Sequence, residues 1–345
     1  MIYSESLATN TSFSAILPAL QLAWDSTSLG SLKLCPRRYK YEIIDGYVLP
    51  VDDSVHLRFG LEYHSALEYY DHLRSDKISH KDALHETVRF ALTKTWDTDL
   101  GRPWISNDPN KNRETLIRSI IGYLDTFEND SLETVILANN KAAVELSFNL
   151  DLPGWISLTS ESFILCGHID RLVNFSGGVW CSDRKTTKKT LSNSYFAMYS
   201  PDNQVSLYSY AGKVIFSDET KGLIIDAAQI LVNETRYQRG IVPRSDSQLE
   251  EWISDTNHYV KLAETYAKNN YWPQNDKSCG AVYVDPKTDE VKFGCPFRPV
   301  CGSAPEIRET LLKLNYERRV WDPIKKRERP NLIEAETEPA KEQHQ

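Results

Sequence analysis

Two aspartates and one lysine in the middle of the chain have a spacing that could support hydrolytic chemistry. Asp170 precedes the turn Gly177-Gly178, and Asp183 and Lys185 follow it. If the two segments that flank the turn pair as a β-hairpin, Asp170 and Asp183 converge at one end of it. Lys185 lies two residues after Asp183, so on a strand both side chains point to the same face.

Such a group of charges is costly to bring together unless a ligand compensates for it. A hard divalent cation such as Mg²⁺ or Mn²⁺ binds carboxylate oxygens together with water and phosphate. It lowers the pKa of a bound water molecule, and Lys185 could orient that water or stabilise a pentavalent transition state. The alternative is that Asp170, Asp183 and Lys185 form ordinary ion pairs on the surface of a hairpin.

Hydrophobic periodicity indicates the elements that must position these residues. Strands are expected at residues 143–150, 162–175 and 224–233, and a further strand starts at 179–182. Helices are expected at residues 57–76, 80–96, 112–128, 194–216, 246–269 and 304–316, after a first helix that Ser28 caps and that runs through Ile43. The order of helices, strands, helix and strand indicates an α/β core with an N-terminal helical insertion.

Four motifs together resemble the PD-(D/E)XK nuclease superfamily, in its RecB-like exonuclease branch. They are a helical His64, Gly-x-Ile-Asp-Arg around Asp170, Asp-x-Lys at Asp183, and Gln-x-x-x-Tyr from Gln204 to Tyr208. The resemblance covers residues 28–301, and the motifs follow the order of the family. Taken one by one, His64 could be a core histidine, and Gln204 and Tyr208 could simply be neighbours on a helix.

The resemblance implies a restriction-endonuclease-like core, in which helices flank a mixed central sheet. The implied site residues are the metal ligands His64, Asp170, Asp183 and the backbone carbonyl of Arg184, with Lys185 as the catalytic lysine and Gln204 and Tyr208 supporting the site and contacting DNA. The upstream strand offers Glu145, where the family often has an acidic residue. That side chain either joins the site or faces solvent.

The positions of four of the six cysteines resemble a second feature of the same branch. One lies near the first helix, and three lie in C-terminal loops rich in Gly and Pro. The AddB nuclease subunit, the CRISPR-adaptation nucleases and exonuclease V share this arrangement, which implies a [4Fe–4S] cluster on Cys35, Cys279, Cys295 and Cys301. Zn²⁺ bound to the same four thiolates is the competing interpretation. Cys166 and Cys181 lie inside predicted strands and are interpreted as core residues.

Composition limits the class of protein. The 345 residues include 40 Lys and Arg against 48 Asp and Glu, a formal net charge of −8, with 41% hydrophobic residues. These values are typical of a folded chain and exclude a histone-like basic protein. Basic clusters at residues 37–40 and 184–189 could still attract DNA phosphates. No basic residue precedes Lys33 and no apolar run approaches about 20 residues, which predicts a cytoplasmic protein without a membrane span.

We expect one nuclease domain over residues 1–320, followed by a disordered tail at 321–345. Its parts are a helical part (26–130), a catalytic core (131–270) and a C-terminal cysteine-rich segment (271–316). The expected function is a Mg²⁺- or Mn²⁺-dependent DNA exonuclease acting on single-stranded ends, in phage or bacterial recombination, repair or replication.

Two alternatives remain open at this point. One is a catalytically weak DNA-binding scaffold with the same fold. The other is a CRISPR-adaptation-type nuclease that trims DNA for an integrase. The chain contains no Walker A sequence, so a helicase or recombination partner would be a separate protein.

Overall fold

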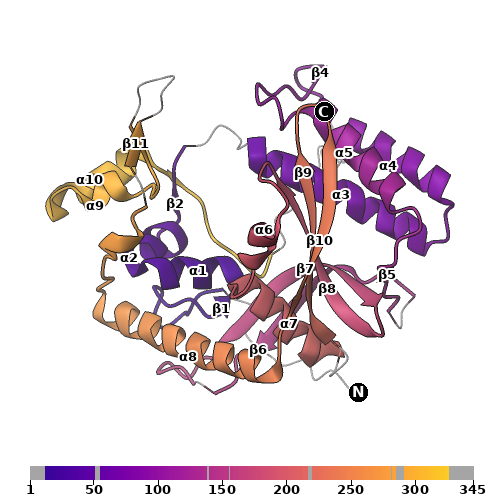
Figure 1. The fold of residues 1–345 in the computed structure, drawn as a ribbon. Coiled ribbons are helices and arrows are strands. Elements are labelled where there is room, and N and C mark those ends of the chain that lie inside the picture. Colours follow the sequence, from indigo (N-terminus) through magenta and orange to yellow (C-terminus); the bar gives the residue numbers. More distant parts are fainter. Residues whose placement is uncertain are drawn as a thin grey trace, which may run out of the picture.

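The computed structural model describes residues 12–50, 55–137, 140–154, 156–216, 220–280, 282–284 and 291–325. Its centre is a mixed sheet in the order β1–β7–β8–β9–β10, with β5 and β6 also paired to β7. The strands are β1 (Ala23–Trp24), β5 (Glu133–Thr134), β6 (Val144–Asp151), β7 (Ile164–Phe175), β8 (Gly178–Thr187), β9 (Thr220–Ile230) and β10 (Thr235–Pro243). Helices flank this sheet (Figure 1), which confirms the predicted α/β class with a restriction-endonuclease-like mixed sheet.

The central hairpin forms as predicted, but its turn is Ser176-Gly177 rather than Gly177-Gly178, because Gly178 already pairs with Phe175. Strands β7 and β8 pair antiparallel, and Ser176 and Gly177 take positive φ angles of 48° and 76° in the turn between them. A glycine accepts this conformation without a steric penalty. Strand β8 then runs parallel to β9. Because parallel neighbours need a crossover connection, helices separate β8 from β9 in the chain.

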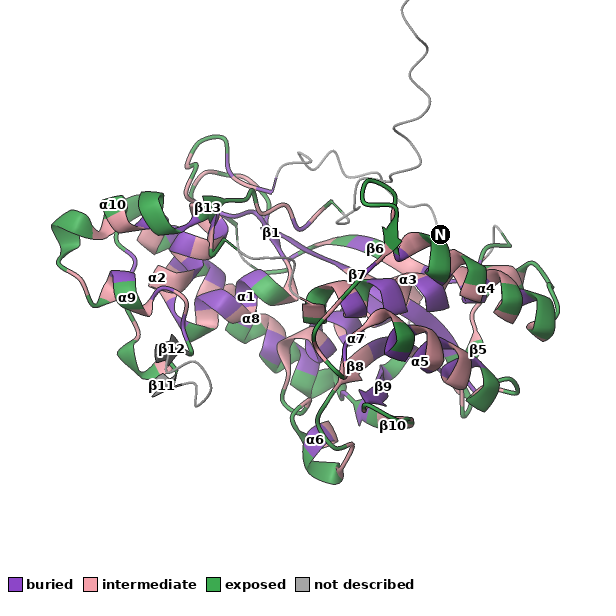
Figure 2. Cartoon of the chain, turned by 90° about the horizontal axis from the view of Figure 1, so that it is seen from above, coloured by how far each residue is buried: buried purple, intermediate pink, exposed green. Residues whose placement is uncertain are grey.

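Helices cover the two opposite faces of the sheet, and the buried residues concentrate between the layers (Figures 1 and 2). One layer contains α1 (Ser26–Leu34), α7 (Asn203–Phe216) and α8 (Asp246–Asn269), and the other contains α3 (Val55–Ser75), α4 (His80–Lys94) and α5 (Arg113–Thr126). Phe59, Tyr63 and Leu67 of α3 are buried in one cluster with α5 and the end of β9. The predicted helices at 57–76, 80–96 and 112–128 therefore form the second layer.

The first helix begins and ends differently from the prediction. Asp25 caps it: the Asp25 carboxylate accepts from the Ser28 N–H, and the Ser28 hydroxyl accepts from the Asp25 N–H. Ser28 is thus the N3 residue of a capping box, and its assignment as the cap is wrong. The helix stops at Cys35, because Pro36 disfavours helical backbone at the preceding residue. The chain continues in α2 (Pro36–Tyr39) and the π-helical turn η1 (Lys40–Ile44).

Two further elements depart from the prediction. Residues 194–216 form two helices, α6 (Asn193–Ala197) and α7, because Pro201 between them has no N–H for a helical hydrogen bond. Strand β10, which the hydrophobic pattern does not predict, pairs antiparallel with β9 over nine residues. Most of its residues are at least partly exposed, which weakens the apolar signal of a strand.

The C-terminal segment packs against the N-terminal helices. It contains η3 (Asp276–Ser278), β11 (Val282–Val284), β12 (Val291–Phe293), α9 (Arg298–Cys301), α10 (Pro305–Asn315) and β13 (Glu317–Arg318). Strand β13 pairs with β2 (Tyr47–Val48), and rings of Tyr41, Phe297 and Tyr316 pack together beside them. We call residues 35–48 and 276–318 the cysteine module.

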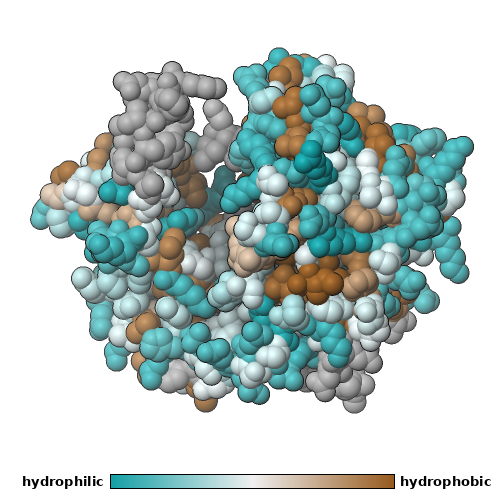
Figure 3. All heavy atoms as spheres, viewed as in Figure 1, coloured by the Kyte–Doolittle hydropathy of each residue, from teal (hydrophilic) through white to brown (hydrophobic). Residues whose placement is uncertain are grey.

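Hydrophilic side chains dominate the visible face, with small hydrophobic groups among them (Figure 3). A short hairpin of β3 (Trp96–Asp97) and β4 (Arg102–Pro103) connects α4 to α5. None of the helices in the described ranges is long and apolar enough to cross a membrane. Of the predicted tail, residues 326–345 lie outside the described residues.

Candidate active site

Three carboxylates form a row across the centre of the sheet. Arg171 pairs with Ser182, so Asp170 of β7 lies opposite Asp183 of β8. On the other side of β7 the register places Glu145 of β6 opposite Asp170, because the residues flanking Glu145 pair with those flanking Asp170. Directly opposed residues on antiparallel strands point to the same face. The hairpin therefore brings Asp170 and Asp183 together, and β6 adds a third acid.

Helix α3 supplies an imidazole to this row. The Nδ1 atom of His64 lies 3.2 Å from Oδ2 of Asp170. Ligand atoms of His64, Glu145 and Asp170 all lie within 4.8 Å of one another, and each of these residues is half-buried. Two carboxylates and an imidazole at this separation form a donor set that suits a divalent cation.

Glu145 is the member of this set that sequence reasoning left undecided. Its φ angle of 50° interrupts the regular pairing of β6 with β7. A non-glycine residue in this conformation is uncommon and marks a constrained position. Asp183 does not belong to the group within 4.8 Å, so its predicted role as a ligand stays a prediction. The only sequence signal for Glu145 was an acid in a strand upstream of the hairpin.

A chain of hydrogen bonds connects Asp183 to helix α7. The Lys185 ammonium lies 2.6 Å from Oδ2 of Asp183 and donates to Oε1 of Gln204 at 2.9 Å. The Gln204 amide then donates to the Tyr208 hydroxyl at 3.2 Å. The i and i+4 spacing of Gln204 and Tyr208 on α7 thus directs both side chains toward β8. The structure brings these four predicted residues together.

Gly167 of the same motif allows the sheet and α7 to approach closely. A Cβ atom at this position would lie 3.0 Å from the Phe148 ring and 3.2 Å from the Tyr208 ring. Those two rings meet edge to face, with centroids 6.1 Å apart. A side chain at position 167 would therefore require the Phe148 or Tyr208 ring to shift by a few tenths of an ångström.

The surroundings shift the pKa values of the charged groups in different directions. Burial alone would raise the pKa of Asp170, but His64, Lys185 and the Arg184 N–H outweigh burial and lower that pKa to about 2. Burial raises the pKa of Asp183, and Lys185 opposes this effect. Burial would lower the pKa of Lys185, yet Asp183 and Asp170 raise it above its ordinary value. The lysine is therefore held as a cation beside the carboxylates.

Arg184 contacts the site through its backbone, while its side chain points away from it. Its N–H donates to Oδ2 of Asp170 at 2.8 Å. Its guanidinium reaches Asp71 of α3 on the opposite face of the sheet, at 2.7 Å. The predicted role of the Arg184 carbonyl as a metal ligand stays a prediction.

The four predicted cluster cysteines lie in the cysteine module. Cys35 and Cys295 are buried and Cys279 and Cys301 are half-buried. The N–H of Asn275 donates to the Cys35 sulfur at 3.4 Å, and the Cys279 thiol lies 3.8 Å from the Asn275 carbonyl. Burial raises the pKa of the Cys301 thiol, with further increases from the other three thiols. The segments that carry these cysteines therefore converge.

Among the described residues, no three cysteine sulfurs lie within 4.8 Å of one another. Cys166 and Cys181 are fully buried in β7 and β8, as predicted for core residues.

Several basic residues, among them two residues of the predicted basic clusters, have partners within the chain. Lys188 lies 3.0 Å from Asp108, and Arg118 donates to backbone carbonyls after β9. Arg239 is bound by Asp130 and Asp226. Arg37 donates to the Trp272 carbonyl and to Gln274 rather than to a carboxylate. Lys188 and Arg239 are thus ion-paired, whereas Arg37 is bound by neutral acceptors.

Comparison with known proteins assigns most of the chain to one family. A family model described as "PD-(D/E)XK nuclease superfamily" matches residues 25–302. A search of curated proteins gave no match to this chain. Among solved structures, the chain is similar to a candidate exonuclease from Eubacterium rectale, with 10% identity and a TM-score of 0.42 over 80% of this chain and 92% of that chain. It is also similar to the protein SSO0001, with 12% identity and a TM-score of 0.27 over 68% of this chain and 75% of that one.

Proposed function

The chain belongs to the PD-(D/E)XK nuclease superfamily, and from this membership we propose that it is a deoxyribonuclease that needs Mg²⁺ or Mn²⁺. Membership makes it a nuclease, an enzyme that hydrolyses phosphodiester bonds. The observation that carries the finer proposal is the convergence of Glu145, Asp170 and Asp183 from three adjacent strands, with Lys185 bound beside them. This arrangement pairs excess negative charge with one cation at a single face.

The donor set fits a divalent cation. His64, Glu145 and Asp170 offer one nitrogen and two carboxylates at short range, and Asp183 lies next in the row. Bound there, the ion would supply a water molecule of lowered pKa and neutralise charge on the scissile phosphate.

Lys185 and its partners are proposed to act on the phosphate of the substrate. The ammonium is held between Asp183 and Gln204, so its remaining hydrogen can donate to a phosphate oxygen of the substrate. Such a bond strengthens as negative charge grows on that oxygen when the P–O bond breaks. Gln204, fixed by the Tyr208 hydroxyl, orients the ammonium for this role. We therefore assign catalysis to Asp170, Asp183 and Lys185, with Gln204 and Tyr208 as positioning residues.

The cysteine module is proposed to hold a [4Fe–4S] cluster on Cys35, Cys279, Cys295 and Cys301. Four converging thiols form the expected donor set. Zn²⁺ bound to the same four thiolates is the competing occupant. The cluster would tie the N-terminal helices to the C-terminal segment.

We propose one nuclease domain over residues 1–320 that acts as an exonuclease on single-stranded DNA ends, in recombination, repair or replication. Pairing of β13 with β2 supports a single unit, because it joins the two ends of the proposed domain. A helicase or recombination protein would be a separate partner. The weak scaffold and the CRISPR-adaptation-type nuclease remain the competing functions.

Digestion of end-labelled linear and circular DNA, with Mg²⁺ or Mn²⁺ added, tests this function. We expect stepwise loss of the label from single-stranded linear DNA and no cleavage of circles. Cleavage of circular DNA would reject the exonuclease mode, and absence of any cleavage would favour the scaffold.

Iron content tests the cysteine module on the same preparation. We expect broad visible absorption and about four iron atoms per chain, both lost in Cys295→Ala. The matched control Cys166→Ala removes a buried thiol of the sheet and should keep the iron. A colourless, zinc-containing protein prepared without oxygen would reject the cluster.

A further inference from the structure

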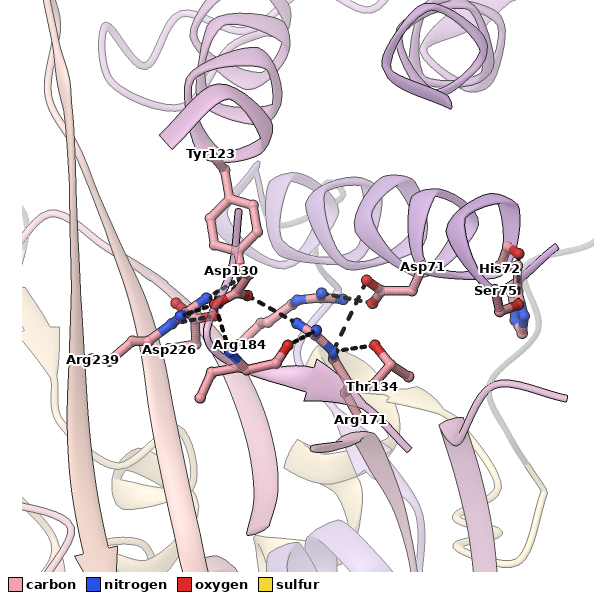
Figure 4. A network of polar contacts seen from close by, with 11 residues as sticks. Asp71, His72, Ser75, Tyr123, Asp130, Thr134, Arg171, Arg184, Asp226 and Arg239 are labelled. Atoms are coloured by element: carbon pink, nitrogen blue, oxygen red, sulfur yellow. Dashed lines mark hydrogen bonds and ion pairs between the residues drawn. The ribbon is translucent and has the colours of Figure 1, made fainter. Parts of the chain in front are cut away.

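The face of β8 opposite the proposed active site carries a buried network of ion pairs. Three aspartates and three arginines meet there: Asp71, Asp130, Asp226, Arg171, Arg184 and Arg239 (Figure 4). The charges balance, three negative against three positive. Asp71, Arg171, Arg184 and Asp226 are each at most 6% exposed. We call this set the arginine network.

Asp71 is the residue that joins helix α3 to this network. Its Oδ2 lies 2.7 Å from the Arg184 guanidinium, and its Oδ1 lies 4.0 Å from Nε of Arg171. In Figure 4 it points from the helix toward both arginines on the strands below. The other carboxylates of the network come from β9 and from the loop after α5. Asp71 is therefore the one member of the arginine network that lies on α3.

The same helix carries His64, seven residues before Asp71. Seven residues are close to two helical turns, so both side chains project from the same face of α3, about 10 Å apart along its axis. His64 meets Asp170 of β7, and Asp71 meets Arg184 of β8. The backbone N–H of Arg184 donates to that same Asp170. One arginine thus contacts both the metal-binding aspartate and the helix that brings the histidine.

Apolar packing alone does not fix the position of α3 along the sheet. Phe59, Tyr63 and Leu67 bury the helix against the sheet, but such contacts are non-directional. A buried ion pair has a preferred geometry, and fixing register is the best-attested use of such pairs. We propose that the Asp71–Arg184 pair is a positioning device that holds α3 in the register at which His64 completes the metal site. This inference rests on the proposed metal site of the nuclease.

Binding of Mn²⁺ to the purified full-length chain, followed by the electron paramagnetic resonance of free Mn²⁺, tests this role without measuring activity. We expect Asp71→Asn to raise the Kd for Mn²⁺ roughly tenfold, as for other residues that orient metal ligands. Asp130→Asn is the matched control, because it removes the same charge from the same network but not from α3. It should leave the Kd close to that of the wild type, even if it lowers the melting temperature as much.

Equal Kd values for Asp71→Asn and the wild type, or equal increases in both variants, would overturn the inference. If Asp71→Asn does not fold, Asp71→Glu keeps the charge but lengthens the side chain by one methylene, and an unchanged Kd in that variant would also overturn it. A wild-type chain that binds no Mn²⁺ would instead reject the proposed metal site itself.

Discussion

The two faces of strand β8 carry charges in different arrangements. On the face toward α7, Asp183 joins the row of Asp170 and Glu145, and these three carboxylates face His64 and one lysine. On the face toward α3 and α5, the arginine network balances three acids with three guanidinium groups. Alternation along one strand separates the two sets, since Asp183 and Lys185 point one way and Arg184 points the other.

The charges of the two faces differ in their proposed role. Those of the carboxylate row bind a metal ion, and those of the arginine network stabilise the fold. A balanced and buried set stabilises the fold only as a whole, because removing one member leaves another uncompensated. An unbalanced set of acids repels itself and is tolerated where a cation completes it. Burial does not distinguish the two faces, since Asp183 and Arg184 are 2% and 3% exposed. The balance of charge distinguishes them.

The largest expected effect comes from the unbalanced face. Asp170→Asn removes one carboxylate that meets His64, and we expect DNA cleavage to slow by about a thousandfold, or about 4 kcal/mol of transition-state stabilisation. The free energy of unfolding should also fall, because the contacts that lower the pKa of Asp170 stabilise the folded chain. Single-turnover cleavage and urea unfolding measure the two quantities. Asp151→Asn, at the exposed end of β6, is the control that should change neither.

The next effect, on the balanced face, should be on stability rather than on rate. Asp226 accepts from the Tyr123 hydroxyl at 2.5 Å and lies 3.1 Å from Nε of Arg239. Asp226→Asn leaves Arg239 with one carboxylate fewer, and we expect the free energy of unfolding to fall by about 3 kcal/mol. Cleavage per folded molecule should stay near that of the wild type. A variant as stable as the wild type but inactive would contradict the division between the faces.

A smaller effect is expected for the hydrogen bond that orients the lysine. Gln204→Ala removes the acceptor 2.9 Å from the Lys185 ammonium without removing any charge. Cleavage should slow by about tenfold, a range seen for residues that orient a functional group. The rate at saturating metal ion measures this loss. Gln238→Ala, at an exposed position of β10, should cleave as fast as the wild type, and equal rates in both variants would remove Gln204 from the site.

The smallest effect should come from an exposed pair. Glu86 lies 3.0 Å from Arg89 on α4, and both side chains are largely exposed. Glu86→Gln should change the free energy of unfolding by less than about 0.5 kcal/mol, because water screens such pairs. A loss comparable to that of Asp226→Asn would show that burial and balance do not set the cost.

The sequence predicts the unbalanced face better than the balanced one. Asp170, Asp183 and Lys185 lie within sixteen residues around one glycine turn, so local spacing is enough to bring them together. The Gln204 and Tyr208 spacing is likewise local to one helix. Asp71 and Arg184 are 113 positions apart, and no periodicity indicates that they meet.

Two other features that the sequence did not predict also depend on contacts between segments distant in the chain. The role of Glu145 depends on the register of β6 against β7, which the sequence of β6 alone does not determine. Strand β10 gains its place by pairing with β9 rather than through an apolar pattern. The sequence could have predicted that residues 194–216 form two helices, since Pro201 interrupts the helical pattern.

We propose that the carboxylate row makes this chain a metal-dependent DNA nuclease. Cleavage of end-labelled DNA by the wild type and by Asp183→Asn, each with Mn²⁺ and with EDTA, tests it most directly. We expect the wild type to cleave only with Mn²⁺, and Asp183→Asn to be at least about a thousandfold slower while remaining folded. Cleavage by Asp183→Asn at the wild-type rate, or wild-type cleavage that persists in EDTA, would contradict the claim.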